Sequence, residues 1–499
     1  MTLLDTERML YRSQFILGTY FIDRFISWKR IKIGNTIHLT VHPDLNTYQV
    51  TIEEKSVTLL GYILDPNNPE YSDSDIVNNL SHKIFNNEVN YFEQTYDFGG
   101  RWILIVEDGK ETRLFADPAG LRQVVYTDRD YTGDFWCASQ PGIIAEILNL
   151  EMDDDAVSFI NFFKMKNDEY YWPGDSSPYK GIKHLLPNHF LELKKRACYR
   201  YWPDKAFKEI PLNEATEKCS RYLEGLMISA SKRYDLSLSL SSGWDSRLLL
   251  AACRKIKNNL SYLTEIKHDM DKTHADLRIP SKLLSKLKLI HHICAAPTKI
   301  KDHHFKEIFD KGVPFAHDKW ALKAEAYFNY YDLKKVAVVG TVSDIAKRYY
   351  HNSTSNDKTV TSQKLSKLIG SENDKFALTH LDKWIMGIGE IYNYNVLDLF
   401  YWEQRAGRWV ATNNLEFDVG WQDIFIPYNC RALLVVMLSV NEEFRMAPNY
   451  VLYDKIIRRL WPKVLSEPIN PHKRESLTNK YKKQLRRLKK TLLNSFTPR

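Results

Sequence analysis

One segment, LSLSLSSGWDSRLLLAACRK at residues 236–255, constrains the fold more than any other. Alternating β-formers run to Leu240, a turn of small residues follows, and a helical pattern begins near Asp245. A strand that turns tightly into a helix points backbone N–H groups and the helix N-terminus at one place, which is how proteins hold phosphate. The segment therefore predicts a phosphate loop, although a helix capped by serine and aspartate has the same local pattern.

The residue types in this loop suit phosphate chemistry. Serine hydroxyls add hydrogen-bond donors, and Gly243 lets the backbone approach a ligand closely. Asp245 would repel phosphate, so its expected role is to hold Mg²⁺, which bridges phosphate oxygens. The predicted phosphate-binding residues are Ser241, Ser242, Gly243, Trp244, Asp245 and Ser246.

The patterns on the two sides of the loop predict two kinds of structure. Residues 1–205 hold short β-like runs, with a hairpin expected at Asp108-Gly109. After residue 206, strand-like and helical runs alternate, which predicts a parallel sheet with crossover helices. From about residue 370 the pattern is mainly helical. The expected fold class is α/β, with a layered N-terminal domain, a parallel-sheet domain and a helical C-terminal part.

Length, composition and charge narrow the class of protein further. A chain of 499 residues is too long for one core, so two or three domains are expected. Its six cysteines form no CxxC pair, which argues against a zinc site or a disulfide framework and favours a cytoplasmic protein. No signal-peptide pattern and no long apolar run is present. Much of the +8 charge lies near the C-terminus, so general nucleic-acid binding is not expected.

Two loops resemble a known family. SSGWDS resembles the SGGxDS signature of the PP-loop ATP pyrophosphatases, in particular the asparagine synthetase family, with Ser242 in place of the middle glycine. KKVAVVGTVSDIAKRYY resembles the family's second acidic loop, SGxGxDE, and keeps Gly340 and Asp344. The positions that depart from this second motif are Val339, Val342 and Ile345.

The resemblance extends over most of the chain, from about residue 55 to 470. FGGRWILIVEDGKETRLFADPAGLRQVVYT is similar to a stretch of the family's N-terminal domain, and WEQRAGRW with IPYNCRAL resembles its helical region. The resemblance implies a degenerate Ntn-hydrolase-like αββα domain at residues 1–205 and a PP-loop synthetase domain at 206–470. A basic amphipathic helix is expected at residues 471–499.

The N-terminal domain lacks the features of a glutaminase. Family members that hydrolyse glutamine have cysteine after the initiator Met, whereas this chain has Thr2. No recognisable first strand precedes LLGYIL, and no glutamine-binding loop is found. We expect a structural domain, with a working Thr2 nucleophile as the less favoured alternative.

The resemblance implies ATP-dependent amide formation through an acyl-adenylate, with AMP and pyrophosphate released and nitrogen taken from ammonia or a substrate amine. Within the family, the chain resembles the branch without a glutaminase, which includes β-lactam synthetases, lasso-peptide cyclases and sugar-acid amidating enzymes. Asp245 and Asp344 would share Mg²⁺, since both follow strands of one parallel sheet. The residues expected to border the nucleotide are Leu240, Leu263, Val339 and Gly340.

The catalytic base is not identified by the sequence. Lys455 and Lys473 are candidates for the family's lysine, although for each one alone a solvated surface lysine is the favoured interpretation. Glu403 is the candidate for a Tyr–Glu base pair, but Thr341 stands where the tyrosine is expected. Glu403 has the alternative of pairing with Arg405 or Arg408.

Several alternatives stay open. The chain could be a non-catalytic ATP-binding or scaffold homologue, or could perform another PP-loop chemistry such as tRNA modification. The substrate could be a small-molecule, sugar or peptide carboxylate, and a homodimer is a further option. For the basic C-terminal helix, two interpretations have equal weight: it packs on the synthetase domain, or it binds an anionic partner or a membrane surface.

Overall fold

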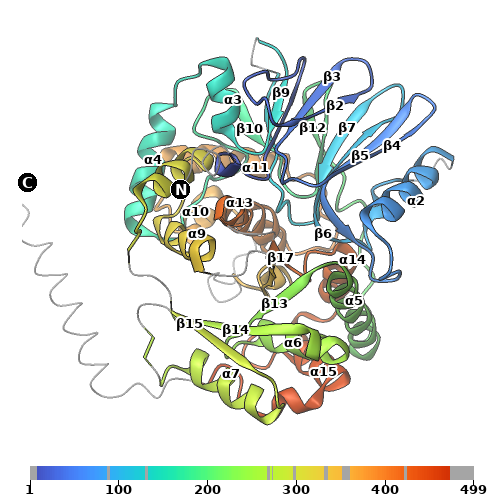
Figure 1. Ribbon diagram of the computed structural model, residues 1–499, viewed down its shortest axis with the longest axis vertical. Helices are drawn as coiled ribbons and strands as arrows, with labels where there is room; N and C mark the ends of the chain where they lie inside the picture. The colour runs from blue at the N-terminus through green and yellow to red at the C-terminus, as the bar shows by residue number, and fades with distance from the viewer. Residues whose placement is uncertain are drawn as a thin grey trace, which may run out of the picture.

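A computed structural model describes residues 8–86, 90–129, 133–266, 270–271, 273–295, 299–330, 335–350, 360–420 and 424–471. These residues form a mixed α/β structure with two antiparallel sheets, one parallel sheet and surrounding helices (Figure 1). The predictions for Thr2, for Lys473 and, beyond Pro471, for the basic helix of residues 471–499 fall outside the described residues. No helix of the described ranges is both long and apolar enough to cross a membrane.

The two antiparallel sheets are built from the N-terminal half, and each has six strands. The order in the first sheet is β10 (Ile182–His184), β8 (Val125–Thr127), β9 (Trp136–Ala138), β1 (Phe15–Gly18), β3 (Ile37–Val41) and β2 (Lys29–Ile33). The order in the second sheet is β12 (Ala197–Arg200), β11 (His189–Glu192), β7 (Thr112–Ala116), β6 (Gly99–Glu107), β5 (Lys55–Leu64) and β4 (Thr47–Ile52).

The two sheets pack face to face, and helices cover their outer faces. Phe15 and Leu39 of the first sheet share a buried cluster with Ile103 and Leu114 of the second. The outer face of the first sheet packs on α3 (Pro141–Leu148), and that of the second packs on α2 (Asp73–Asn86). The resulting order of layers is helix, sheet, sheet, helix.

The strand β1 corrects one expectation from the sequence. No first strand was recognised before LLGYIL, yet β1 to β4 all precede it. All four residues of β1 are buried, so the strand has no polar alternation to mark it, and it has only four residues. The hairpin at Asp108-Gly109 is confirmed by the antiparallel pairing of β6 with β7.

The parallel sheet belongs to the C-terminal half, and its strand order makes a crossover. The order is β15 (His291–Ala295), β14 (Leu260–Ile266), β13 (Asp235–Ser239), β16 (Lys335–Val338) and β17 (Ile424–Phe425), all paired in parallel. The chain therefore runs from β13 outward to β14 and β15, and then crosses back to form β16 and β17 on the other side of β13. Such a reversal opens a crevice at the carboxyl ends of the two strands where it occurs.

Helices surround the parallel sheet and join it to the N-terminal half. Those before residue 340 are α4 (Asp154–Lys166), α5 (Leu212–Arg233), α6 (Trp244–Ala252), α7 (Ala275–Lys286), α8 (His303–Gly312) and α9 (Asp318–Tyr330). Those after it are α10 (Ser362–Ile369), α11 (Lys375–Gly387), α12 (Val396–Phe400), a π-helical segment (Tyr401–Val410), α13 (Ala411–Gly420), α14 (Arg431–Leu438) and α15 (Val451–Leu460).

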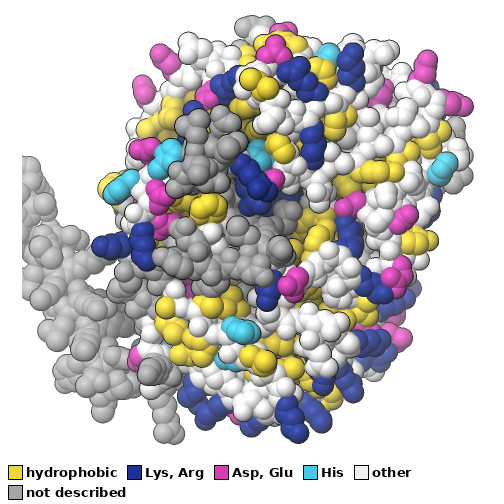
Figure 2. Space-filling view, viewed as in Figure 1, with side chains coloured by type: hydrophobic (Ala, Val, Ile, Leu, Met, Phe, Trp, Pro, Cys, Tyr) yellow, Lys and Arg dark blue, Asp and Glu magenta, His cyan; other side chains and the backbone are white. Residues whose placement is uncertain are grey.

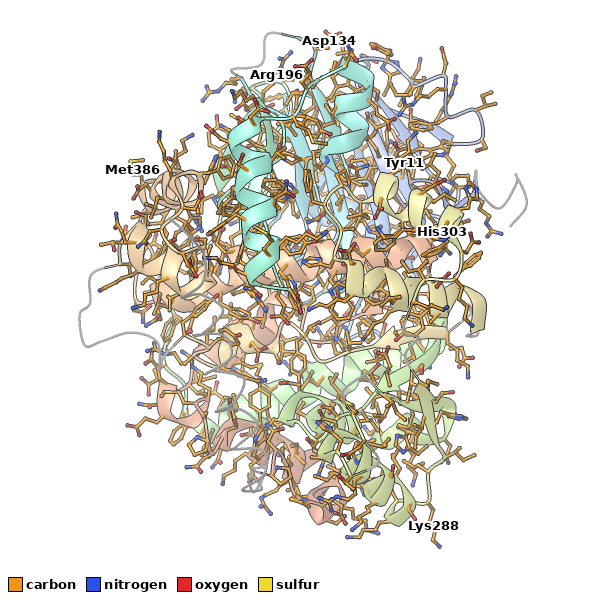
Figure 3. All side chains as sticks on the ribbon, turned by 90° about the vertical axis from the view of Figure 1, so that its left-hand side faces the viewer. Tyr11, Asp134, Arg196, Lys288, His303 and Met386 are labelled. Carbon is orange, nitrogen blue, oxygen red and sulfur yellow. The ribbon has the colours of Figure 1, made fainter. Side chains whose placement is uncertain are left out.

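The N-terminal sheets and the parallel sheet lie at opposite ends of the molecule. Figure 3 places Asp134, beside the first sheet, at one end and Lys288, just after α7, at the other. Figure 2 shows Lys and Arg side chains gathered along the edge where Figure 1 has α7 and α15. Helix α13 lies between the two ends and contacts both, since its Asp418 pairs with Arg101 of β6 and its Phe417 shares a buried cluster with Leu236 of β13.

Candidate functional site

The predicted phosphate loop lies at the crevice between β13 and β16. Strand β13 ends at Ser239 and α6 begins at Trp244, with Gly243 at the helix N-cap. Gly243 supplies no side-chain cap, so the first turn of α6 is not closed by its own cap residue. The strand, the tight turn and the helix expected from the sequence are therefore present at the reversal of strand order.

The loop after β16 comes very close to this helix start, and glycine makes the approach possible. A Cβ atom built on Gly340 would lie 2.7 Å from the Cβ of Asp245, which is too close for any larger residue. Val342, where the family has its second glycine, has a φ of 75° and is fully buried. A β-branched residue in this backbone region is strained, and such strain clusters at functional sites.

A cavity of about 410 Å³ opens beside the loop, within the size range of small-ligand sites. It lies between the carboxyl edge of the parallel sheet and helices α9 and α13. Its loop side is lined by Leu240, Ser241, Asp245, Ser246, Leu263, Val339, Gly340, Thr341 and Asp344. Glu265 of β14 lines it at the sheet edge, and its far side is lined by Trp320, Lys323, Tyr327, Asn413, Asn414 and Phe417. The hydroxyl of Thr341 is buried and has no hydrogen-bond partner among the described residues.

The structure brings Asp245 and Asp344 together, but around a lysine. The Lys347 ammonium forms ion pairs with Asp245 Oδ1 and, at 2.9 Å, with Asp344 Oδ1. The Ser343 hydroxyl donates to Asp245 Oδ1 at 2.6 Å, and the Tyr401 hydroxyl donates to Asp344 Oδ2 at 3.3 Å. The two carboxylates converge on one point, and the Lys347 ammonium occupies it.

Burial and the oppositely charged neighbours act in opposite directions on the pKa values of Asp245 and Lys347. Burial raises the pKa of Asp245, and the Lys347 ammonium partly offsets that rise. Burial by itself would lower the pKa of Lys347, but the carboxylates of Asp245 and Asp344 raise it well above its ordinary value. Lys347 therefore stays charged at neutral pH.

Mg²⁺ held between Asp245 and Asp344, as the sequence predicted, does not fit this arrangement. Mg²⁺ takes about six oxygen ligands in near-octahedral geometry. Here three of the four carboxylate oxygens, Asp245 Oδ1 and both oxygens of Asp344, already accept a hydrogen bond or an ion pair, and a cation lies between the two side chains. Within the described ranges no group of three Asp, Glu, His or Cys side chains could hold a metal ion.

The donors of the loop are also engaged within the protein. Asp276, at the start of α7, accepts from the Ser242 backbone N–H at 2.9 Å and from the Ser242 hydroxyl at 2.6 Å. The Gly243 N–H donates to Ser241 Oγ at 3.2 Å, and the Ser241 N–H donates to Ser246 Oγ at 3.1 Å. The Asp276 carboxylate thus takes donors that a bound phosphate would use.

The predicted loop residues divide into those that face the cavity and those that do not. Ser242, Gly243 and Trp244 shape the turn without lining the cavity. Trp244 instead packs near Tyr450, with 5.8 Å between ring centroids. The other predicted nucleotide-binding residues, named above, all lie on the cavity wall.

The two predicted catalytic residues within the described ranges lie elsewhere. Lys455 is exposed on α15 and does not line the cavity. Glu403 is fully buried and pairs with Arg200, not with Arg405 or Arg408. Asn188 and the Trp384 indole also donate to it, at 2.9 and 2.8 Å. A carboxylate that is engaged in this way and lies away from the cavity cannot serve as a base there, so the structure does not support Glu403 as the catalytic base.

Predictions from the sequence did not identify the far wall of the cavity, nor Lys347, which pairs with Asp245 and Asp344. Trp320 and Lys323 lie on α9, where Lys323 pairs with Glu265 at 2.6 Å and lies 4.6 Å from the Trp320 ring. No motif marks these residues, because a helix far along the chain brings them to the sheet edge. Lys347 did carry a signal, since it lies three residues after Asp344 and residues that far apart meet on one helical turn.

Comparisons with known proteins add little. No protein-family profile and no curated protein matches the chain. One similar solved structure is described as the allosteric regulatory enzyme of purine biosynthesis, at 11% identity and a TM-score of 0.24, covering 57% of this chain and 66% of that one. Another is glutamine phosphoribosylpyrophosphate amidotransferase from B. subtilis complexed with ADP and GMP, at 10% identity and a TM-score of 0.24, covering 79% and 90%.

These likenesses assign the chain to no family. The chain spans just under two thirds of the first of these structures, and both TM-scores are too low to support an argument from either protein. The class that the described residues themselves define is a mixed α/β protein with a ligand-sized cavity at the crossover of a parallel sheet.

Proposed function

We propose that this chain binds ATP at the cavity beside Asp245 and uses it to form an amide bond from a carboxylate and an amine or ammonia. The observation that supports this best is the position of the small-residue loop at the reversal of strand order, directly on a cavity of about 410 Å³. Ligands of open parallel sheets bind at such points, and a helix start beside a small-residue turn favours an anion.

The proposed reaction follows from the chemistry of carboxylates. A carboxylate is a poor electrophile because its oxygen is a poor leaving group. Attack of the carboxylate on the α-phosphorus of ATP gives an acyl-adenylate and releases pyrophosphate. An amine nitrogen then attacks the acyl carbon, AMP leaves, and the amine gives up its extra proton.

Two paired side chains on the cavity wall suit the second step. The reaction needs a base for the amine and a cation near the developing oxyanion. Glu265 of β14 and Lys323 of α9 form an ion pair on the cavity wall, both less than one fifth exposed. We assign Glu265 the role of base and Lys323 that of cation, and the aromatic wall of Trp320, Tyr327 and Phe417 the task of excluding water.

The test is pyrophosphate release from ATP across a panel of carboxylates with ammonia or an amine. We expect release with at least one pair of substrates and loss of nearly all of it in Asp245→Ala, because Asp245 lies on the loop at the cavity. Lys455→Ala is the matched control, since this lysine is exposed on α15 and outside the cavity. A chain that neither binds ATP nor releases pyrophosphate would exclude the proposal.

The Lys347 cluster favours a second candidate, nucleotide binding without chemistry. The cavity wall carries the carboxylates of Asp245, Asp344, Asp276 and Glu265, against two lysine ammonium groups nearby. This excess of negative charge opposes the negative charge that develops at the α-phosphate and on the leaving pyrophosphate during adenylyl transfer. In this case, ATP or ADP raises the melting temperature of the protein while no substrate pair gives pyrophosphate.

A further inference from the structure

Lys347 is one of the most enclosed charged side chains beside the cavity. It is 9% exposed, and its ammonium lies 5.4 Å from the Tyr453 ring centroid and 5.7 Å from that of Tyr450. Asp245 and Asp344 line the cavity, whereas Lys347 does not. The ammonium therefore reaches the two carboxylates from the protein side and not from the cavity.

The local backbone fixes this position. The turn Ser343–Ala346 follows Val342 and carries Lys347 directly after it, so Asp344 and Lys347 lie on one side of a helical turn. The Tyr453 hydroxyl donates to the Ser343 carbonyl at 3.3 Å, and the Lys347 backbone N–H donates to the Asp344 carbonyl at 3.1 Å. The lysine is therefore held by its own turn as well as by its charge partners.

The electrostatic effect resembles that of a bound metal ion. Two partly buried carboxylates that converge on one point would repel one another, and a cation between them removes that repulsion. An aspartate pair can gain such a cation either from a divalent ion or from a side chain. Here the side chain is already in contact with both acids, and a divalent ion at the same place would meet a positive charge within the length of a hydrogen bond.

We propose that Lys347 is the resident cation of this site and replaces a divalent metal ion between Asp245 and Asp344. The wild-type protein then has no metal site at this acidic pair, and ligand binding in the cavity does not depend on a metal ion held by these two carboxylates. The proposal rests on the proposed function only in taking this cavity as the ligand site.

The test is binding of Mn²⁺ to the full chain, measured by electron paramagnetic resonance in the absence of any nucleotide. We expect no site in the wild type that depends on Asp344, and a new site in Lys347→Ala, where the removal of the ammonium leaves two carboxylates and room for the ion and its water. Mn²⁺ should bind at this new site roughly ten-fold or more tightly than it binds anywhere on the wild type. The double variant Lys347→Ala with Asp344→Asn should lose the gained site.

Lys323→Ala is the matched control, because Lys323 also neutralises a carboxylate on the cavity wall, that of Glu265. It should gain no Mn²⁺ site. Lys347→Gln, which removes the charge but keeps most of the side-chain volume, replaces Lys347→Ala if circular dichroism shows that the alanine variant is unfolded.

Two results would overturn the proposal. One is a wild-type Mn²⁺ site that Asp245→Asn or Asp344→Asn abolishes. The other is a folded Lys347 variant that gains no Mn²⁺ binding, since Lys347 would then not be what excludes the ion. Neither result depends on ATP, so failure of the ligase proposal leaves this measurement decisive.

Discussion

At the scale of single residues, the loop differs from an open phosphate site because charged side chains already engage its donors and acidic groups. Asp276 takes two donors of Ser242, and Lys347 takes one oxygen from each of Asp245 and Asp344. An incoming phosphate must therefore displace the Asp276 carboxylate to reach the Ser242 N–H. Hydrogen bonds to charged groups are strong, so this exchange lowers the net affinity.

Asp276→Ala should strengthen binding of ADP. The substitution frees the two Ser242 donors and removes one negative charge from the cavity wall, so we expect the dissociation constant to fall by about ten-fold, or about 1.4 kcal/mol. Isothermal titration calorimetry measures it. Asp271→Ala, in the exposed turn just before α7, is the control and should leave the affinity unchanged. Weaker binding in Asp276→Ala would mean that Asp276 supports the ligand-bound loop.

At the scale of elements, α6 depends on the segment that follows α15. The Arg247 guanidinium is 1% exposed and donates to the carbonyls of Val464, Glu467 and Pro468 at 2.7, 2.8 and 3.2 Å. The Asn470 N–H donates to the Ser242 carbonyl at 2.9 Å. The far end of the described chain thus supports both the helix and the turn of the candidate loop.

Arg247→Met should destabilise this junction. The methionine keeps much of the buried volume but leaves three carbonyls without their donor, which should cost about 3 kcal/mol of unfolding free energy. Urea denaturation measures the loss, and hydrogen exchange should rise in residues 462–471. The exposed Arg254 donates to one carbonyl, that of Leu460, so Arg254→Met should cost less than about 1 kcal/mol. Equal losses in the two variants would contradict this role for Arg247.

At the scale of the whole molecule, buried polar contacts join the N-terminal sheets to the C-terminal half. Arg101 of β6 and Asp418 of α13 form a two-bond ion pair at 2.6 and 2.7 Å, and the two side chains are 1% and 2% exposed. Asn429 donates to the Gly100 carbonyl and to Asp117 Oδ1, both at 2.8 Å. Since α13 also lines the cavity, the N-terminal half supports the far wall of the candidate site.

Arg101→Met should destabilise the protein strongly, because it removes the two guanidinium hydrogen bonds from the buried Asp418 carboxylate. We expect a loss of about 3–5 kcal/mol, read from urea denaturation. The double variant Arg101→Met with Asp418→Leu should recover part of the loss, because no uncompensated charge remains. The exposed pair of Lys218 and Glu214 is the control, and Lys218→Met should cost less than about 0.5 kcal/mol. No recovery in the double variant would contradict this account.

Local patterns predicted the strands and helices around the candidate loop. The β-run before Leu240 and the helix after Gly243 are present because alternation and helical periodicity are set by neighbouring residues. The strand β1 was missed because four residues that are all buried carry no alternation. Glu403 was misassigned because its partner Arg200 is 203 residues away along the chain, on β12.

The sequence by itself determined the two acidic loops and the strands that end at them, since a turn of small residues between a strand and a helix is a local property of the chain. Only the tertiary structure decided what those loops meet: the cation between Asp245 and Asp344, the carboxylate on Ser242 and the aromatic wall from α9 and α13. The physical reason is that charge pairing and burial depend on distances across the fold, which residue spacing does not encode.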